Sequence, residues 1–69
     1  IITPEFRDLK NGKYIVISFF AKKARGWMTR FILENDIKNA RDLQAFEKEG
    51  YHYNPNMSQT NKPVFTRDH

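Results

Sequence analysis

The segment Leu9-Lys10-Asn11-Gly12-Lys13-Tyr14 carries the clearest fold signal in the sequence. The dipeptide Asn-Gly readily adopts the positive φ angles that a two-residue turn between antiparallel strands requires. We therefore expect a β-hairpin with strands over residues 1–9 and 13–19, the second rich in β-branched and aromatic side chains. Pro4 cannot donate a hydrogen bond to a neighbouring strand, which favours an edge position or a bulge near the start of the first strand.

The second of these strands is apolar on both faces. Alternate side chains of a strand point to opposite sides. One side would carry Ile15, Ile17 and Phe19, and the other Tyr14, Val16 and Phe20. So short a chain has little material to cover a second apolar face, so we expect the segment to pack against further protein.

After this strand the apolar period changes from two residues to three or four, which predicts an amphipathic helix over residues 20–34. The expected buried stripe is Phe20, Ala24, Trp27, Met28, Phe31 and Asn35. The opposite face would hold Lys22, Lys23, Gly26, Thr29 and Arg30, with Arg25 at its flank. One side of the helix is therefore apolar and the other is basic.

A second, shorter helix is expected over residues 39–46, with Asn39 as its N-cap and Gly50 as its terminator. Residues 51–53 and 63–67 are typical of two short strands separated by a polar loop. The predicted fold class is α+β, with the element order ββααββ: a hairpin, two helices and a second hairpin.

Composition limits how this chain can be stabilised and which partners it can have. The 69 residues include no cysteine, which excludes disulfides and thiolate metal sites as stabilising elements. The longest apolar run, residues 14–20, is far too short to cross a bilayer, so no membrane contact is expected. Of the net charge of +4, residues 1–30 contribute +5 (seven basic, two acidic) and residues 31–69 contribute −1 (five basic, six acidic). Positive charge is therefore concentrated in the first half of the chain.

The run Ile17-Ser18-Phe19-Phe20-Ala21-Lys22-Lys23-Ala24-Arg25-Gly26 resembles the signature of the YaaA family of bacterial peroxide-stress proteins. Two positions depart from it, because tyrosine is expected in place of Phe20 and a smaller aliphatic residue in place of Trp27. Both departures fall on the apolar helix face. The other positions of the resemblance, which covers essentially the whole chain, are residues 3–8, 11–14, 28, 30, 32, 43–46, 50–51 and 64–67.

This resemblance implies that residues 1–69 are the C-terminal segment of a cytoplasmic protein several times longer, and not an independent complete domain. It further implies protection against hydrogen peroxide, limitation of free iron and binding to DNA. The family's helix-hairpin-helix element lies upstream of the matched region, so that element's DNA-binding role does not transfer to this chain. The implied partners are the remainder of the parent protein and DNA; the sequence does not indicate an oligomeric state.

The best candidate site is the basic helix face, with Lys22, Lys23, Arg25 and Arg30 as nucleic-acid or phosphate ligands. They occupy the early turns of a helix that directly follows a strand, where unpaired backbone N–H groups and the helix dipole favour an anion. The alternative is a solvated face, or an ion pair with Glu34 or with an acid elsewhere in a longer protein.

Other chemistries have weak support. The two histidines, His52 and His69, are far apart and lack a carboxylate at ligand spacing, so no metal ligand or cofactor is expected. A serine triad would need Ser18 or Ser58 beside His52, and nothing in the spacing recommends it. We expect no catalytic residue in the segment. Aromatic side chains can stack on exposed nucleic-acid bases, but periodicity places most of those in this chain in a core: Phe19, Phe20, Trp27, Tyr51 and Tyr53.

Three functions remain open from the sequence. The first is a DNA-binding surface in a stress protein, with salt-sensitive, sequence-independent contacts. The second is an enzyme segment in which Lys22, Lys23 and Arg25 hold the phosphate of a nucleotide-like substrate. The third is a purely structural scaffold.

Overall fold

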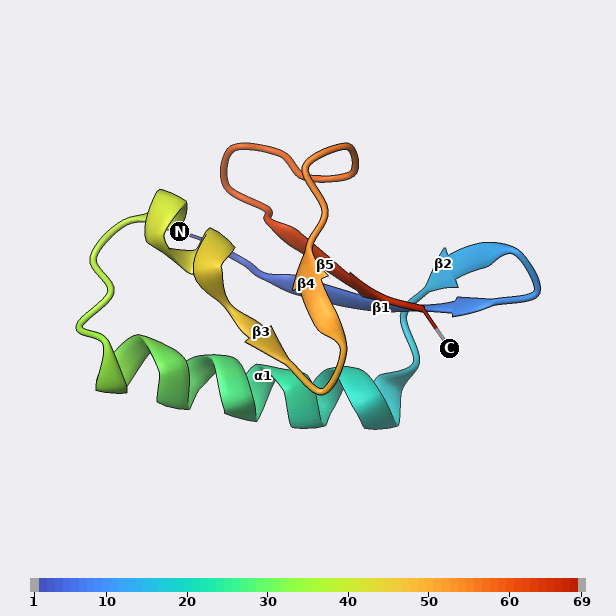
Figure 1. Cartoon of the computed structure of the whole chain (residues 1–69), viewed down its shortest axis with the longest axis horizontal. Coiled ribbons are helices and arrows are strands. Elements are labelled where there is room, and N and C mark those ends of the chain that lie inside the picture. The colour runs from blue at the N-terminus through green and yellow to red at the C-terminus, as the bar shows by residue number, and fades with distance from the viewer. Residues whose placement is uncertain (1, 69) are drawn as a thin grey trace.

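The computed structural model describes residues 2–68. A five-stranded sheet lies over one long helix, with a short helical segment at one end (Figure 1). In chain order the elements are β1 (Glu5–Lys10), β2 (Lys13–Ile15), α1 (Ser18–Glu34), the 3₁₀ helix η1 (Ala40–Ala45), β3 (Glu47–Lys48), β4 (Tyr51–Tyr53) and β5 (Val64–Arg67).

The sheet has the strand order β2-β1-β5-β4-β3. Its centre is a parallel pair, β1 and β5, in which Phe6 is aligned with Phe65 and Asp8 with Arg67. All the other neighbours are antiparallel. The first and last strands of the chain therefore lie side by side in the middle of the sheet, an arrangement that the sequence pattern did not predict.

The predicted first hairpin is confirmed. Asn11 and Gly12 have φ angles of 54° and 80°, and Lys10 is aligned with Lys13 across the turn. The first strand begins at Glu5, directly after Pro4, and Ile1 lies outside the described residues.

The second strand was predicted too long: β2 ends at Ile15, and α1 begins at Ser18 in place of residue 20. Phe19 therefore lies on the helix, and the expectation of a strand with two apolar faces was wrong. A short apolar run fits a strand or a helix equally well. Here the helix forms because the spacing of Ala21, Ala24 and Met28 lets all three be buried against the sheet.

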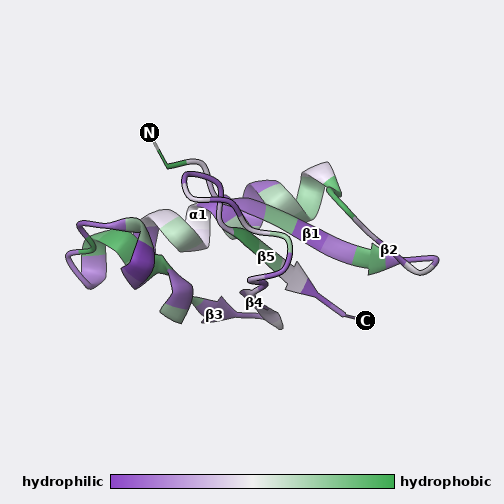
Figure 2. Ribbon diagram, turned by 90° about the horizontal axis from the view of Figure 1, so that it is seen from above, coloured by the Kyte–Doolittle hydropathy of each residue, from purple (hydrophilic) through white to green (hydrophobic). Residues whose placement is uncertain are grey.

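The core is an aromatic cluster between the sheet and α1. The Phe6 and Phe65 rings stack with their centroids 5.4 Å apart, and Phe46 meets both of them edge-on at 5.9 and 5.5 Å. Small residues of α1 let the helix approach this cluster closely. Figure 2 colours the strands and α1 by the hydropathy of each residue, with hydrophobic residues in green. Fully burying aromatic side chains stabilises a fold by about 1.5–3 kcal/mol each.

The second helix is a 3₁₀ helix that ends at Ala45, well before Gly50. Its predicted N-cap is confirmed, because the Asn39 side chain accepts a hydrogen bond from the Asp42 backbone N–H at 3.2 Å. Gly50 instead forms a turn with Glu49, with φ angles of 89° and 52°. This turn joins β4 to the unpredicted strand β3, so the order ββααββ was wrong.

The second predicted hairpin is confirmed as the antiparallel pair β4–β5, with Tyr53 aligned with Phe65. Within residues 54–62 the loop is held by Ser58, whose hydroxyl donates to the Asn54 carbonyl and accepts from the Val64 N–H, both at 2.7 Å. Ser58 is thus structural. Among residues 2–68 no helix has both the length and the apolarity to cross a bilayer, α1 having 17 residues.

Candidate nucleic-acid interface

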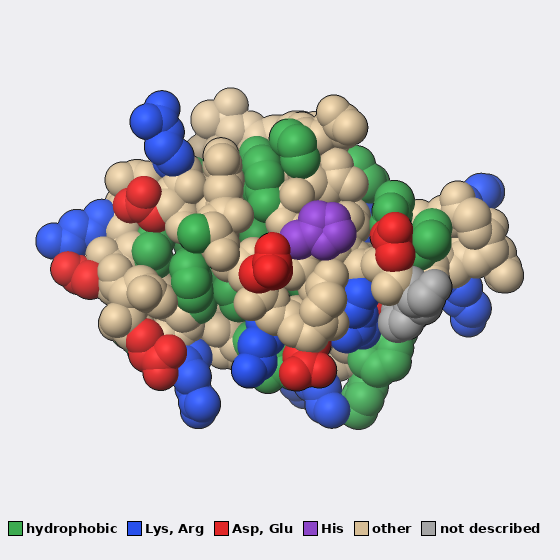
Figure 3. Space-filling model, in the orientation of Figure 1, with side chains coloured by type: hydrophobic (Ala, Val, Ile, Leu, Met, Phe, Trp, Pro, Cys, Tyr) green, Lys and Arg blue, Asp and Glu red, His purple; other side chains and the backbone are tan. Residues whose placement is uncertain are grey.

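Helix α1 presents all four predicted cations to solvent. Lys22, Lys23, Arg25 and Arg30 are exposed, whereas Ala24 and Met28 of the same helix are buried. Within residues 2–68 none of the four basic side chains makes an ion pair. Figure 3 shows Lys and Arg side chains projecting along the lower edge of the molecule, where α1 lies. The alternative of an ion pair with Glu34 is not found among residues 2–68.

The four cations form a fan and not a single cluster. At about 100° per residue, Lys23 and Arg30 lie within roughly 20° of one another, and Lys22 and Arg25 within roughly 60°. The fan spans about 160° of the helix circumference. One edge of the fan faces the β3 side of the sheet and the other faces the loop before β5.

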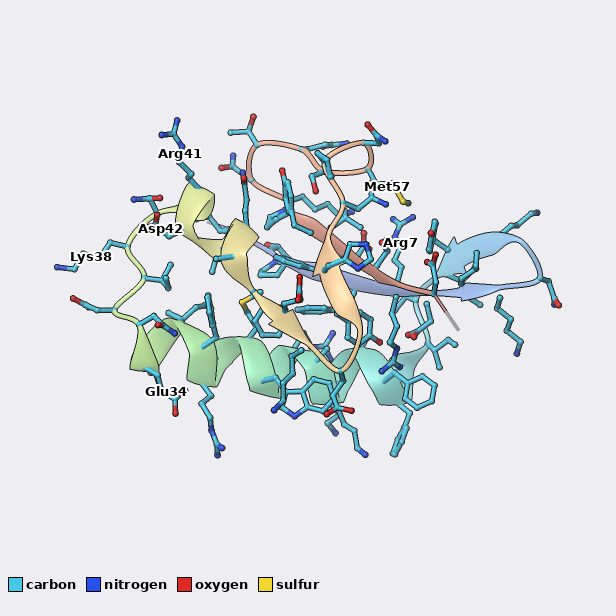
Figure 4. All side chains as sticks on the ribbon, in the orientation of Figure 1. Arg7, Glu34, Lys38, Arg41, Asp42 and Met57 are labelled. Atoms are coloured by element: carbon cyan, nitrogen blue, oxygen red, sulfur yellow. The ribbon has the colours of Figure 1, made fainter. Side chains whose placement is uncertain are left out.

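The two edges of the fan differ in their charge environment. Arg30 lines a hollow that also contains Lys48 and two carboxylates, Glu34 and Glu47. Positive potential is therefore partly cancelled there, although the carboxylate of Glu34 extends outward from the end of α1 (Figure 4).

The Arg25 edge is more strongly positive. Arg25 lines a hollow with Lys62 and Glu5, and Glu5 is already paired with Arg7 at 2.8 Å and with Lys62 at 3.7 Å. Lys62 is an exposed cation that the sequence pattern did not predict here, since it lies 37 residues from Arg25 in the chain. The parallel pairing of β1 with β5 brings it there.

The start of α1 lies two residues earlier than expected. Ile17 is the N-cap and supplies no side-chain hydrogen bond, and the first turn contains no acidic residue. The first turn of α1, residues 18–21, therefore precedes Lys22 and Lys23, which lie in the second turn. The ammonium of Lys23 instead lies 4.9 Å from the centroid of the exposed Phe19 ring.

A buried polar network lies beside the start of α1. Asp8 is fully buried and accepts hydrogen bonds from the Tyr51 hydroxyl at 2.5 Å and from Arg67 Nε at 2.6 Å. The Arg67 guanidinium lies over the Tyr51 ring at 4.2 Å and over the Phe20 ring at 5.0 Å. The network joins β1, β4, β5 and α1. Because its groups are satisfied by one another, it positions the elements and is not itself a ligand site.

Burial and proximity to a carboxylate make Tyr51 hard to ionise. Loss of solvation raises the pKa of the Tyr51 phenol well above its usual value of 10.0, and its hydrogen bond to Asp8 raises the pKa further. At the surface, the Tyr14 hydroxyl donates to Asp68 at 2.7 Å, and this hydrogen bond raises the pKa of Tyr14.

The structure brings no metal or catalytic constellation together in the part of the chain that it describes. Residues 2–68 contain no group of three histidine, cysteine or acidic side chains close enough to hold a metal ion. His52 is exposed, with Nδ1 3.3 Å from the Gly50 carbonyl, and His69 lies outside the described residues. Ser18 is the first residue of α1 and is exposed.

Comparison with known proteins gives a family. The family model described as "Peroxide stress protein YaaA" matches residues 1–57. A protein of Hahella chejuensis is 52% identical over 69 residues, which cover all of this chain and 27% of that relative. A protein of Shewanella sp. strain ANA-3 is 50% identical over 68 residues, covering 99% of this chain and 26% of that relative.

A third relative, from Flavobacterium psychrophilum, is 55% identical over 67 residues, covering 97% of this chain and 27% of its own length. All three relatives carry the description UPF0246 protein. This chain thus spans about a quarter of the length of the relatives that it matches. On the strength of the model match and of these identities, the chain belongs to the YaaA family of peroxide stress proteins.

Proposed function

We propose that this segment gives a peroxide-stress protein a surface that binds the phosphate backbone of duplex DNA. The observation that carries the proposal is the open cationic fan of α1, defined by Lys22, Lys23, Arg25 and Arg30. All four are exposed and none forms an ion pair within residues 2–68. Residues 18–34 hold these four cations and one acid, Glu34, for a charge of +3.

The type of contact follows from the chemistry of the fan. Lysine and arginine side chains on an exposed helix neutralise phosphates and release counterions, which makes binding salt-dependent. Such contacts position a protein on DNA and carry no sequence information. The fan offers no amide side chain at its centre for base recognition, since Gly26 and Thr29 lie there. Binding is therefore sequence-independent.

The cellular role we propose is protection from hydrogen peroxide, by limiting oxidative damage to DNA and the free iron that promotes it. Family membership supports the peroxide-stress part of this role. The iron-limiting part requires no metal site in this segment, because it can operate through other parts of a longer protein. Binding of DNA through the fan would hold the protein beside the DNA that it protects.

The test is a salt titration of duplex DNA binding by two charge-matched triple variants. The first replaces Lys22, Lys23 and Arg25 with alanine, which keeps the helix because alanine is a strong helix former. The control replaces Lys10, Lys38 and Arg41, which are also two lysines and one arginine and are exposed elsewhere. Figure 4 shows Lys38 and Arg41 pointing outward at the end of the molecule opposite the β2 hairpin.

The fan variant is expected to lose most of its DNA affinity, and the slope of log K against log salt should become shallower by about 3, roughly one for each lost phosphate contact. The control variant should keep the slope. An equal loss of DNA affinity in both variants would show that only the net charge of the protein matters, and would contradict the proposal. Unchanged DNA binding with lost affinity for a mononucleotide would favour the enzyme alternative, and no change in either would leave a scaffold.

A further inference from the structure

Apolar side chains lie uncovered where β2 leads into α1. Ile15, Val16 and Phe19, named here the junction patch, are 39%, 47% and 65% exposed. Phe19 lies in the first turn of α1, and its ring touches Phe20 edge-on at a centroid distance of 5.6 Å. Hydrophobic side chains gather at the lower right of the molecule in Figure 3, over the start of α1. Three large apolar residues are therefore exposed within five positions of the chain, which is more than the single exposed apolar residues normal on a surface.

A free strand edge lies beside the junction patch. β2 is the outermost strand of the sheet and pairs on one side only, with β1. Its outer edge therefore presents backbone N–H and C=O groups without a strand partner in residues 2–68. Proteins usually cover such an edge or protect it with charge. The uncovered edge and the uncovered side chains coincide at one end of the molecule.

The size of the chain indicates what covers them. The segment exposes 5033 Å², whereas a complete folded monomer of 8.3 kDa exposes about 4,600 Å². The matched relatives extend far beyond this segment, which spans only 27% of the Hahella chejuensis protein. A family chain therefore has ample further residues that can pack here.

A second copy of the chain fits the patch less well. Three side chains of this size expose roughly 300 Å², against about 800 Å² per partner in a typical stable interface. A segment of the same polypeptide needs much less area, because the covalent connection gives it a high effective concentration.

We propose that the junction patch is the docking surface for the part of the family chain that lies outside these 69 residues. That part covers Phe19, Ile15 and Val16 and lies along the outer edge of β2. The inference goes beyond the DNA-binding proposal, and the two surfaces adjoin: the Lys23 ammonium lies 4.9 Å from the centroid of the Phe19 ring, and Val16 lines the same hollow as Arg25. Leu33, which is 75% exposed, is excluded from the patch because it lies about 21 Å along the helix from Phe19.

Photo-crosslinking of the complete gene product that carries these residues tests the proposal. The photoreactive amino acid p-benzoylphenylalanine replaces Phe19 in one variant and Leu33, an equally apolar position of the same helix, in the control. After irradiation, mass spectrometry should find the Phe19 variant joined to a peptide of the same polypeptide outside residues 1–69. The Leu33 variant should give no such product. A Phe19 product with DNA, with a second copy or with another protein would overturn the proposal, as would the absence of a product.

Thermal unfolding of the same gene product provides the second readout. Phe19→Ser should lower Tm by roughly 10 °C, as expected for a buried aromatic side chain, and Leu33→Ser should leave Tm nearly unchanged. If Phe19→Ser does not fold, Phe19→Leu should still give a measurable decrease. Equal Tm for Phe19→Leu and the unmodified protein would contradict docking at this patch. The DNA-binding proposal fails separately, in the salt titration.

Discussion

At the scale of single residues, Asp8 has the strongest influence on the fold. Its carboxylate is fully buried at the centre of the sheet and is held by Arg67 and Tyr51. Removing one partner of such a group leaves the others desolvated and unpaired, which costs far more than an exposed ion pair contributes. The exposed pair Lys38–Asp36, at 3.6 Å, is by comparison worth little.

The Tyr51 phenol makes stability depend on pH in the alkaline range. The pKa of Tyr51 is raised in the folded state, so the folded protein keeps this proton when the unfolded chain has lost it. The free energy of unfolding should therefore be unaffected by this group below pH 10 and fall above it, by up to about 1.4 kcal/mol per pH unit. Urea denaturation at pH 9 to 11 measures this fall.

Tyr51→Phe is the matched control for this pH dependence. It should cost about 1–2 kcal/mol at neutral pH, through the lost hydrogen bond to Asp8, and should make the alkaline fall shallower. Tyr14 titrates in both proteins and cancels in the comparison. An identical slope in the two proteins would show that Tyr51 ionises as freely in the folded state as in the unfolded chain.

The network around Asp8 could not be predicted from the sequence. Its partners Tyr51 and Arg67 are 43 and 59 residues away, and the contacts exist only because β1 pairs in parallel with β5. The one local signal was that Asp8 shares a strand face with Phe6, since they are two residues apart. An acid at such a position is a candidate for a buried charge with a distant partner.

At the scale of elements, the sequence predicted those features that depend on local chemistry. The Asn11-Gly12 turn and the Asn39 cap need only their own side chains and backbone, and both are confirmed. The Glu49-Gly50 turn escaped prediction because a glycine after a helical pattern also fits a helix terminator. The start of α1 was misplaced because residues 15–20 satisfy both apolar periods, and only packing against the sheet decides between them.

The three glycines should respond differently to alanine. Gly26→Ala should raise the free energy of unfolding by about 1 kcal/mol, because Gly26 lies within α1 and a Cβ there meets open space. Gly12→Ala should lower it by about 1 kcal/mol, because Gly12 has a φ of 80° but no close neighbour. Gly50→Ala should cost more than Gly12→Ala, because its Cβ would also lie 3.1 Å from the Arg67 side chain.

Chemical denaturation of the three glycine variants checks this order. The order tests the backbone geometry of both turns and the exposure of the outer face of α1. A Gly50→Ala variant as stable as the unmodified chain would show that Glu49 and Gly50 do not form the turn described here. Destabilisation by Gly26→Ala would show that the outer helix face is closely covered.

At the scale of the whole molecule, α1 has one side buried against the sheet and an opposite, exposed side that carries the cations. The amphipathic pattern predicted this division, because Ala24 and Met28 recur at helical spacing, whereas Lys22, Lys23 and Arg30 fall on the opposite face. The sequence could not show that Arg30 lies beside Glu34 and Glu47, or that Lys62 extends the positive surface near Arg25, because tertiary contacts bring these groups together. DNA binding by the fan stays a prediction.

Footprinting of lysines by acetylation, with and without duplex DNA, tests that prediction most directly. DNA is expected to lower the labelling of Lys22 and Lys23 several-fold at low salt and to leave Lys10 and Lys38 unchanged, with the protection lost as salt is raised. Equal protection of all four lysines, or unprotected Lys22 and Lys23 on saturated DNA, would contradict it.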